Sequence, residues 1–172
     1  MLKLRVRSIT FEGEDILSFE LVDPAGAELP PFDAGAHIDV KTPVGMMRRY
    51  SLCNAPGRRD HYRIAVLQTP NSRGGSRAMH ELIRAGDLIE ISGPYNFFLL
   101  DALAHHVILL AGGIGITPLI SMVEQLEQQG KSYELHYCTK SPERTAFLPR
   151  LANRVATGRV HIYHDLGDPL QG

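Results

Sequence analysis

The stretch from Val107 to Pro118, which reads V-I-L-L-A-G-G-I-G-I-T-P, constrains the possible fold of this chain more than any other. It opens with an uninterrupted apolar run, which is typical of a strand buried on both faces, as in a parallel sheet. Three glycines follow, and after them apolar residues recur at helical spacing. A strand, a glycine turn and a helix aim backbone N–H groups and the positive end of a helix dipole at an anion. The stretch therefore predicts an anion-binding turn, with a helix that begins at Pro118.

Strands and helices alternate after about residue 101. Strands are expected at 107–111, 133–138 and 159–163, separated by helices at 118–129 and 143–155. This βαβαβ order predicts a parallel sheet with crossover helices. Gly130 is expected to end the first helix, and Pro149 to split the second or delay its start. Three strands are few for such a sheet, so residues 101–172 are predicted to be the first part of a Rossmann-like nucleotide-binding domain.

Residues 1–100 show short alternating patterns that predict β-structure. A six-stranded antiparallel Greek-key β-barrel is the expected fold of this first domain, with one helix before its last strand. The Gly93-Pro94 pair is expected to stop that last strand. The predicted strands lie near residues 2–6, 17–21, 38–40, 48–53, 62–67 and 88–91, and the helix lies at 76–84.

Charge and cysteine content exclude several classes of function. The 18 basic and 19 acidic side chains give a net charge of -1, which argues against broad binding to nucleic acid or to acidic membranes. No apolar run is long enough to span a bilayer, and the N-terminus lacks a signal-peptide core, so a cytoplasmic protein is expected. Cys53 and Cys138 have no metal-ligand spacing and the histidines do not cluster, so no metal site is expected. His37 is expected to be a satisfied core histidine.

Arg48-Arg49-Tyr50-Ser51-Leu52 ends one of the predicted strands. A guanidinium group binds phosphate oxygens with a rigid fork of donors, and an aromatic ring offers a flat surface to a planar cofactor. A serine hydroxyl can donate to or accept from the nitrogens of such a cofactor. The same alternation is found on any exposed edge strand, so both interpretations stay open.

Two glycine-containing motifs suggest phosphate binding. Arg73-Gly74-Gly75-Ser76-Arg77 enters the predicted helix with Ser76 as its N-cap, which suits a phosphate site and equally a solvated loop. Gly113-x-Gly115 matches the first half of a dinucleotide fingerprint, but Pro118 stands where its third glycine is expected. The acidic residue expected after the second strand is also missing, where Cys138-Thr139-Lys140 stand. A dehydrogenase fingerprint is therefore not present.

Taken in order, four motifs carry a resemblance to a known family: R-x-Y-S-L, G-G-S before a helix, G-P-Y-N-x-F and A-G-G-I-G-I-T-P. Together they resemble the ferredoxin–NADP⁺ reductase superfamily. Within it, the chain is most similar to the phthalate dioxygenase reductase branch, which includes vanillate O-demethylase reductases. The resemblance covers essentially the whole chain.

The resemblance implies a flavin held by the barrel. Arg48 would contact its phosphate, Tyr50 would lie against the isoalloxazine, and Ser51 would lie near N5. Asn96 in G-P-Y-N-F-F resembles the FMN-using members, so FMN is favoured over FAD. The other cofactor-binding residues implied on the flavin side are Leu52, Arg73, Gly74, Gly75, Ser76 and Arg77.

The resemblance also implies a nicotinamide dinucleotide at the glycine turn, and it makes Ser51 and Thr117 the expected catalytic residues. Lys140 and Arg144 could bind the 2′-phosphate of NADPH, but the branch mostly uses NADH, and Asp165 also fits a site without that phosphate. NADH is therefore favoured over NADPH. The implied nucleotide-binding residues are Gly112, Gly113, Gly115 and Thr117.

The activity implied is electron transfer from NADH through flavin to an iron–sulfur acceptor. That acceptor would be an iron–sulfur domain or ferredoxin, and the final partner a Rieske-type aromatic-ring oxygenase or demethylase. Two distant cysteines cannot hold a four-cysteine cluster, so none is expected in this chain. Family members continue past the third strand, so a truncated reductase is expected. One alternative is a non-catalytic flavin-binding fragment. The other is an oligonucleotide-binding barrel, and the near-zero net charge disfavours that second alternative.

Overall fold

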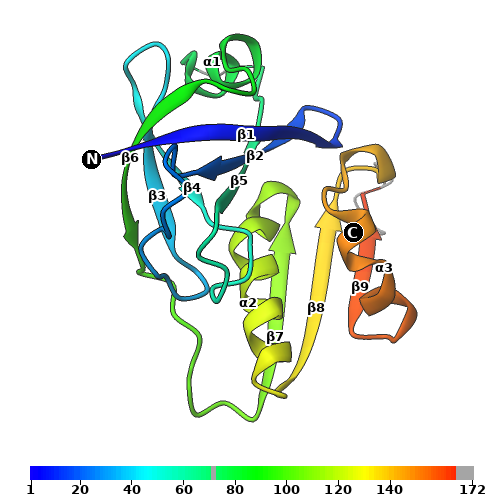
Figure 1. Ribbon diagram of the computed structural model, residues 1–172. Coiled ribbons are helices and arrows are strands. Elements are labelled where there is room, and N and C mark those ends of the chain that lie inside the picture. The colour runs from blue at the N-terminus through cyan, green and yellow to red at the C-terminus, as the bar shows by residue number, and fades with distance from the viewer. Residues whose placement is uncertain (71–72, 166–172) are drawn as a thin grey trace.

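Two β-sheets, one antiparallel and one parallel, pack against each other in this chain (Figure 1). The computed structural model describes residues 1–70 and 73–165. Within this part of the chain, no helix is both long enough and apolar enough to cross a membrane.

The antiparallel sheet has six strands in the order β4-β3-β6-β1-β2-β5. Its two outer strands meet at an antiparallel bridge between Leu52 and Ile64, which closes the sheet into a barrel. The six-stranded antiparallel Greek-key barrel predicted from the sequence is therefore confirmed. The strands are β1 (Leu2–Gly13), β2 (Ile16–Val22), β3 (His37–Lys41), β4 (Met47–Ser51), β5 (Tyr62–Leu67) and β6 (Leu88–Tyr95).

Alternation along the strands fills the barrel. In β1, Leu4 and Val6 are buried, whereas Lys3 and Arg5 between and beside them are exposed. Helix α1 (Gly75–Leu82) lies across one end of the barrel, at the top of Figure 1, and turns Met79 into its core. This helix is where the 76–84 pattern predicted one.

One predicted strand end is wrong. Strand β6 runs through Gly93-Pro94 and ends at Tyr95, beyond the point where the proline was expected to stop it. Its partner β3 pairs with Tyr95 across a register shift between His37 and Asp39. A local irregularity of this kind is where a sheet tolerates a residue that has no N–H to donate.

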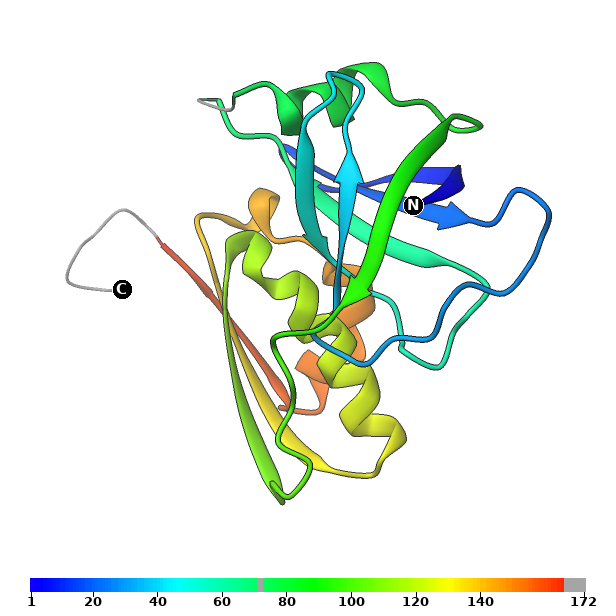
Figure 2. The ribbon, with the colours of Figure 1, turned by 90° about the vertical axis from the view of Figure 1, so that its left-hand side faces the viewer.

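The parallel sheet has the strand order β7-β8-β9, in agreement with the predicted βαβαβ pattern. Figure 2 shows α2 between this sheet and the barrel. The elements are β7 (His106–Gly112), the 3₁₀ turn η1 (Gly113–Gly115), α2 (Ile116–Gln128), β8 (Ser132–Thr139), the 3₁₀ turn η2 (Pro142–Arg144), α3 (Leu148–Ala156) and β9 (Val160–His164).

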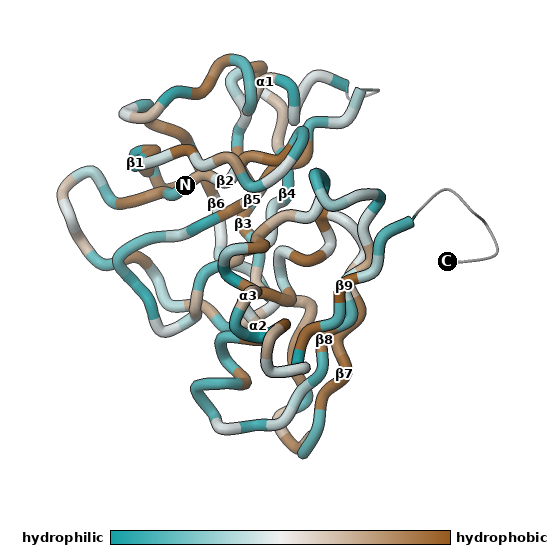
Figure 3. Tube along the Cα trace, turned by 90° about the vertical axis from the view of Figure 1, so that its right-hand side faces the viewer, coloured by the Kyte–Doolittle hydropathy of each residue, from teal (hydrophilic) through white to brown (hydrophobic). Residues whose placement is uncertain are grey.

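The prediction that the first parallel strand is buried on both faces is wrong. Leu109 and Ala111 of β7 are buried, whereas Ile108 and Leu110 are 61% and 75% exposed. In the order β7-β8-β9, each new strand is added at the same edge of the sheet. Because both crossover connections are right-handed, α2 and α3 then lie on the same face. The outer face is left uncovered among the described residues, and Figure 3 shows the hydrophobic stretch of β7 at the edge of this sheet.

Helix boundaries correct one detail and confirm two others. Helix α2 begins at Ile116, so Pro118 is its third residue and not its first; a first-turn N–H has no intrahelical acceptor, which makes proline acceptable there. Gly130, at φ +65°, follows the last turn of α2 as predicted. Helix α3 begins at Leu148 with Pro149 in its first turn, which confirms the delayed start.

A continuous hydrophobic core joins the two sheets. Apolar side chains of α2 and the parallel sheet pack with residues of the barrel and its loops. The barrel-side members of this core cluster are Ile16, Ala34, Cys53 and Ala65. The predicted division into domains at residues 1–100 and 101–172 stays a prediction.

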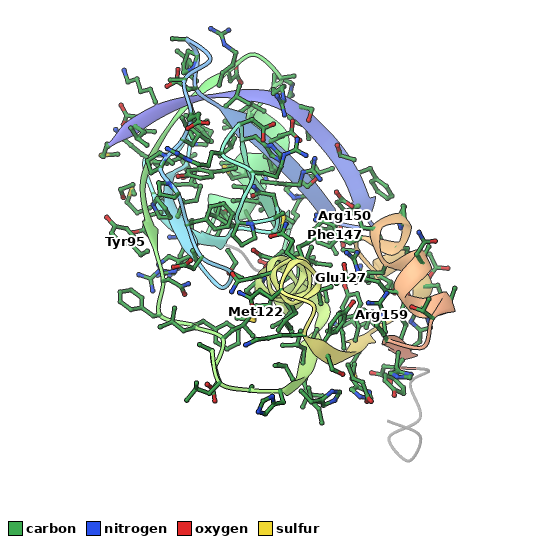
Figure 4. All side chains as sticks on the ribbon, turned by 60° about the horizontal axis from the view of Figure 1, so that its bottom comes forward. Tyr95, Met122, Glu127, Phe147, Arg150 and Arg159 are labelled. Atoms are coloured by element: carbon green, nitrogen blue, oxygen red, sulfur yellow. The ribbon has the colours of Figure 1, made fainter. Side chains whose placement is uncertain are left out.

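Polar contacts reinforce the junction between the sheets. Nη1 of Arg150, on α3, donates to the backbone carbonyl of Cys53 at 2.9 Å. Figure 4 shows this arginine beside Phe147, whose ring centroid is 5.6 Å from the guanidinium carbon. Arg144, in η2, pairs with Glu14 at 3.1 Å and also with the neighbouring Asp15. The turn between β1 and β2 is thereby tied to the parallel-sheet side.

Candidate functional site

Strand β4 presents Arg48 and Tyr50 on one face and Arg49 and Ser51 on the other. Tyr50 packs against the barrel core, and its hydroxyl is buried with no hydrogen-bond partner among the described residues. Burial raises the pKa of Tyr50 to about 12, with the Arg48 charge pulling in the opposite direction. The Tyr50 hydroxyl is therefore protonated, and no described residue accepts a hydrogen bond from it.

The start of helix α1 differs from the sequence prediction. Ser76 was expected to be the N-cap, but Gly74 holds that position at φ +99°, and no side chain caps the helix. Ser76 lies instead in the first turn, with its hydroxyl buried and without a partner in the described structure. No acidic residue lies in this turn. Backbone N–H groups in a first helical turn have no intrahelical acceptor, and together with the Ser76 hydroxyl at a positive helix end they suit an anion.

Arg48 and Gly75 bring the strand and the helix together. A Cβ atom built on Gly75 would lie 2.7 Å from Nε of Arg48 and 3.2 Å from its Cγ. Any larger residue at Gly75 would therefore require the Arg48 side chain to move. The arginine Nη1 also donates to the carbonyl of Met47 at 2.9 Å. The guanidinium group is thus held over the first turn of α1.

Other predicted flavin-side residues lie in different surroundings. Leu52 is fully buried in the barrel core, and its N–H donates to the carbonyl of Ala36 at 2.8 Å. Arg77 is exposed and forms an i,i+4 pair with Glu81 at 3.0 Å. Arg73 is exposed beside the helix start. The structure therefore gathers Arg48, Gly75 and Ser76 directly, and leaves Arg77 pointing to solvent.

His37, next to Ser51, was not identified as a site residue from the sequence. His37 pairs with Ser51 across β3 and β4, and its ring lies 5.8 Å from that of Phe97. Its Nε2 is buried without a partner among the described residues, so the expectation of a satisfied core histidine is wrong; burial lowers its pKa. Asn96 donates to the carbonyl of Ala34 at 3.0 Å and so fixes the loop after β6.

The glycine turn after β7 opens onto a cleft of about 740 Å³. Leu67, at the end of β5, contributes to the wall of this cleft, so barrel and parallel sheet both line it. Leu52, at the end of the β4 motif, bridges to Ile64 on β5, the same strand that ends at Leu67 in the cleft wall. The lining residues are Leu67, Gly112, Gly113, Ile114, Cys138, Thr139, Lys140, Tyr163, His164 and Asp165.

Thr117 holds the shape of the turn. It is 6% exposed, and its hydroxyl donates to the carbonyl of Ile114 at 3.0 Å. Gly113 takes a positive φ of +49° and Gly115 is exposed, so two glycines of the turn leave backbone accessible beside the cleft. In this structure Thr117 acts on the turn, and its predicted catalytic role stays a prediction.

Polar groups gather where the parallel strands end. The hydroxyl of Thr139 lies 2.7 Å from that of Thr145 and 2.9 Å from Nδ1 of His164. Thr139 and His164 line the cleft with Lys140. Sequence reasoning missed this cluster because its members come from different strand ends. The sequence did contain one signal for this cluster: the carboxyl ends of parallel strands lie at one edge of the sheet, and ligands bind at that edge.

Comparisons with known proteins agree with this arrangement. No family model matches the chain. The tert-butanol monooxygenase / tert-amyl alcohol desaturase reductase subunit of Aquincola tertiaricarbonis is 49% identical over 171 residues, which is 99% of this chain and 51% of that protein. Phthalate dioxygenase reductase of Burkholderia cepacia is 48% identical over 98% of this chain and 52% of its own length.

A solved structure is also closely similar. A phthalate dioxygenase reductase, described as a modular structure for electron transfer from pyridine nucleotides to [2Fe–2S], superposes with a TM-score of 0.96 at 47% identity. The match covers 99% of this chain and 54% of that one. The chain spans about half the length of the curated relatives it matches. Over nearly its whole length the chain is therefore similar to phthalate dioxygenase reductase and the vanillate O-demethylase reductases, as the four sequence motifs predicted.

Proposed function

We propose that this chain binds a flavin against the barrel and a nicotinamide dinucleotide at the Gly112–Gly115 turn, and passes electrons from NADH toward an iron–sulfur acceptor. The observation that carries this proposal is the cradle of Arg48, Gly75 and Ser76, in a chain whose barrel and parallel sheet also share a cleft. The similarity to a reductase that transfers electrons from pyridine nucleotides to [2Fe–2S] supports it.

The residues of the cradle suit a flavin phosphate. Arg48 supplies a charged fork of donors, and the first turn of α1 supplies N–H groups without an opposing carboxylate. The hydroxyl of Ser76 would complete its hydrogen bonding on a phosphate oxygen. Tyr50 would lie along the ring system, and Ser51 would orient the ring by a hydrogen bond. A bound flavin supplies the capacity to take up a hydride and release electrons singly.

The cleft residues would bind and position the nucleotide. Glycine at 112 and 113 allows its phosphates to approach the backbone, and Thr117 keeps the turn in the required shape. Hydride transfer requires two rings in contact with water excluded, and no acid–base group is needed for it. The chain's own contribution is therefore orientation and exclusion of water.

The choice of flavin, of pyridine nucleotide and of electron acceptor can also be proposed. We favour FMN, because the sequence around Asn96 resembles the FMN-using members. We favour NADH, because Asp165 lines the same cleft as Lys140 and its carboxylate would repel a 2′-phosphate. The acceptor would be an iron–sulfur domain or ferredoxin that serves a Rieske-type oxygenase.

Flavin titration followed by anaerobic addition of NADH tests the proposal. FMN and FAD are titrated separately by flavin fluorescence, and then NADH and NADPH are compared by bleaching of the flavin absorbance. A yellow protein that bleaches with NADH supports the proposal. A yellow protein that does not bleach indicates a flavin-binding chain without turnover, and failure to bind either flavin overturns the proposal.

Arg48 and Arg49 provide a matched pair for this experiment. Arg48→Ala is expected to lower flavin affinity at least tenfold, because a charged phosphate contact is lost. Arg49 lies on the opposite face of β4, is mostly exposed and pairs with Asp39 at 3.5 Å. Arg49→Ala is therefore expected to leave flavin affinity unchanged. Equal losses in both variants would contradict the placement of the phosphate.

A further inference from the structure

The outer face of the parallel sheet carries a set of polar side chains that the proposed function does not use. Alternation along β8 puts Glu134, His136 and Cys138 on the face opposite α2 and α3. The parallel register sets His136 beside His161 and Cys138 beside Tyr163. Figure 1 shows β8 and β9 side by side at this end of the sheet.

Three of these side chains converge. One ligand atom from each of Glu134, His136 and His161 can be chosen so that all lie within 4.8 Å of one another. Oε2 of Glu134 is 3.6 Å from Nε2 of His136, and the two imidazole rings stack with centroids 4.9 Å apart. All three residues are partly exposed, so an ion from solvent can reach them.

Tyr163 orients one of the imidazoles. Its hydroxyl lies 3.0 Å from Nδ1 of His136, and the two rings stack at 15°. With Nδ1–H donating to the tyrosine oxygen, the lone pair of His136 is on Nε2, the nitrogen that faces Glu134. Metal-binding histidines are commonly held by such a second hydrogen bond, which selects the coordinating nitrogen. This contact is independent of the spacing of the three ligand atoms.

We propose that Glu134, His136 and His161 bind a divalent transition-metal ion, with Zn²⁺ the best match. Two imidazole nitrogens and one carboxylate oxygen are a set that suits zinc and disfavours Mg²⁺ or Ca²⁺, which prefer oxygen ligands. Ligand atoms around tetrahedral zinc are about 3.3 Å apart, so small side-chain rotations close the site. Water would occupy the remaining coordination position.

The sequence did not suggest this site because His161 is distant along the chain from Glu134 and His136. Strand pairing brings His161 beside His136, and period-two alternation brings Glu134 to the same face. The ligands stand on two hydrogen-bonded strands, so the backbone fixes their relative positions. The three ligands lie outside the cradle at Arg48 and do not line the nucleotide cleft, whose wall does include Tyr163. Zinc is therefore titrated without flavin or nucleotide.

Zinc titration by calorimetry and cobalt absorption spectroscopy test the proposal on the full chain. One Zn²⁺ per chain is expected, and Co²⁺ is expected to give a tetrahedral visible spectrum that Zn²⁺ abolishes. His136→Ala and His161→Ala are each expected to weaken binding more than tenfold. Tyr163→Phe, which removes an orienting hydrogen bond, is expected to weaken it up to about tenfold. Circular dichroism confirms that each variant is folded.

Cys138→Ser and His105→Ala are the control variants. Cys138 is exposed on the same face and His105 is an exposed histidine elsewhere, and neither belongs to the cluster. Unchanged zinc affinity in both controls supports the ligand set. Absence of zinc binding by the wild-type chain overturns the proposal. So does binding that survives the double variant His136→Ala/His161→Ala, or binding that is lost in Cys138→Ser.

Discussion

The hydroxyl groups of Tyr50 and Ser76 are buried without hydrogen-bond partners among the described residues. A buried polar group that has lost water and gained no partner destabilises the folded state. Tyr50 lies two residues after Arg48 and Ser76 directly follows Gly75, so under the proposed function a ligand bound there would complete these hydrogen bonds. Stability and ligand affinity then oppose each other at these positions.

Ser76→Ala is expected to separate these two effects. Without flavin, the variant should be as stable as the parent or more stable by up to about 1 kcal/mol, because an unsatisfied hydroxyl is removed. With flavin, its affinity should fall. Ser121→Ala is the matched control, since Ser121 also has a buried, unpartnered hydroxyl but lies in α2. Thermal unfolding and flavin titration measure both quantities; an unchanged affinity in Ser76→Ala would contradict the assignment.

Gly75→Ala tests the close approach to Arg48. The added methyl group would displace the guanidinium group, so flavin affinity should fall at least tenfold, as for loss of a charge-assisted contact. Stability should change by no more than about 1 kcal/mol, because alanine is a better helix former than glycine. In Gly57→Ala the new atom would meet only Gln128, at 4.0 Å. That control should bind flavin normally, and equal behaviour of the two variants would argue against the cradle.

At the scale of elements, an ion-pair network joins α2, α3 and the start of β9. Glu127 accepts from Arg154 at 2.6 Å and lies 3.3 Å from Arg159. Tyr133 donates to the same carboxylate at 2.6 Å. The hydrogen bond from Arg154 lowers the pKa of Glu127 from its ordinary value. The charged carboxylate is therefore part of what holds the two helices together.

Glu127→Gln is expected to destabilise the chain in a pH-dependent way. The folded-state pKa is depressed, so this carboxylate contributes stability above its ordinary pKa of 4.5, and the contribution is lost as the pH falls through the folded-state value. The variant should cost about 1 to 2 kcal/mol at neutral pH, and the difference should shrink in acid. Urea unfolding at several pH values measures this. Glu81→Gln, at an exposed i,i+4 pair, should have little effect at any pH.

The sequence predicted the elements well where local rules decide them. Strand alternation, Gly130 after α2 and the late start of α3 at Pro149 follow from neighbours in the chain. Features that depend on distant partners were not accessible. The proline in β6 is tolerated through a register shift on β3, and the exposure of Ile108 depends on which face both crossovers cover.

The site was predictable to the same extent. The motifs identified Arg48 and the glycine turn because their residue types carry the chemistry. They did not reveal the contact of Arg48 with Gly75, the cluster at Thr139 or the pairing of His136 with His161. Each of these contacts depends on strand register or on the placement of a helix, and neither can be deduced from a single sequence.

At the scale of the whole molecule, the shared core predicts that the two sheets unfold together. Arg150 donates to a backbone carbonyl of the barrel loop and pairs with Glu124 at 3.3 Å. Arg150→Ala should destabilise both sheets by about 1 to 3 kcal/mol, because the Cys53 carbonyl loses its charged donor. Hydrogen exchange should show equal loss of protection in β5 and β8. Loss in one sheet alone would show that they unfold independently, and exposed Arg58→Ala should change neither.

The bridge between Leu52 and Ile64 also has a consequence for the rates at which a ligand enters and leaves. Strand β4 is paired along its length with β3 but meets β5 at this isolated bridge. Next to the bridge, Cys53 N–H donates to the carbonyl of Arg63 at 2.9 Å. This line has fewer backbone pairs than the other strand pairs of the barrel, so we expect it to open while they stay intact. Exchange of a cofactor held along β4 is then expected to be much faster than global unfolding. A chain prepared without cofactor should load it without being denatured.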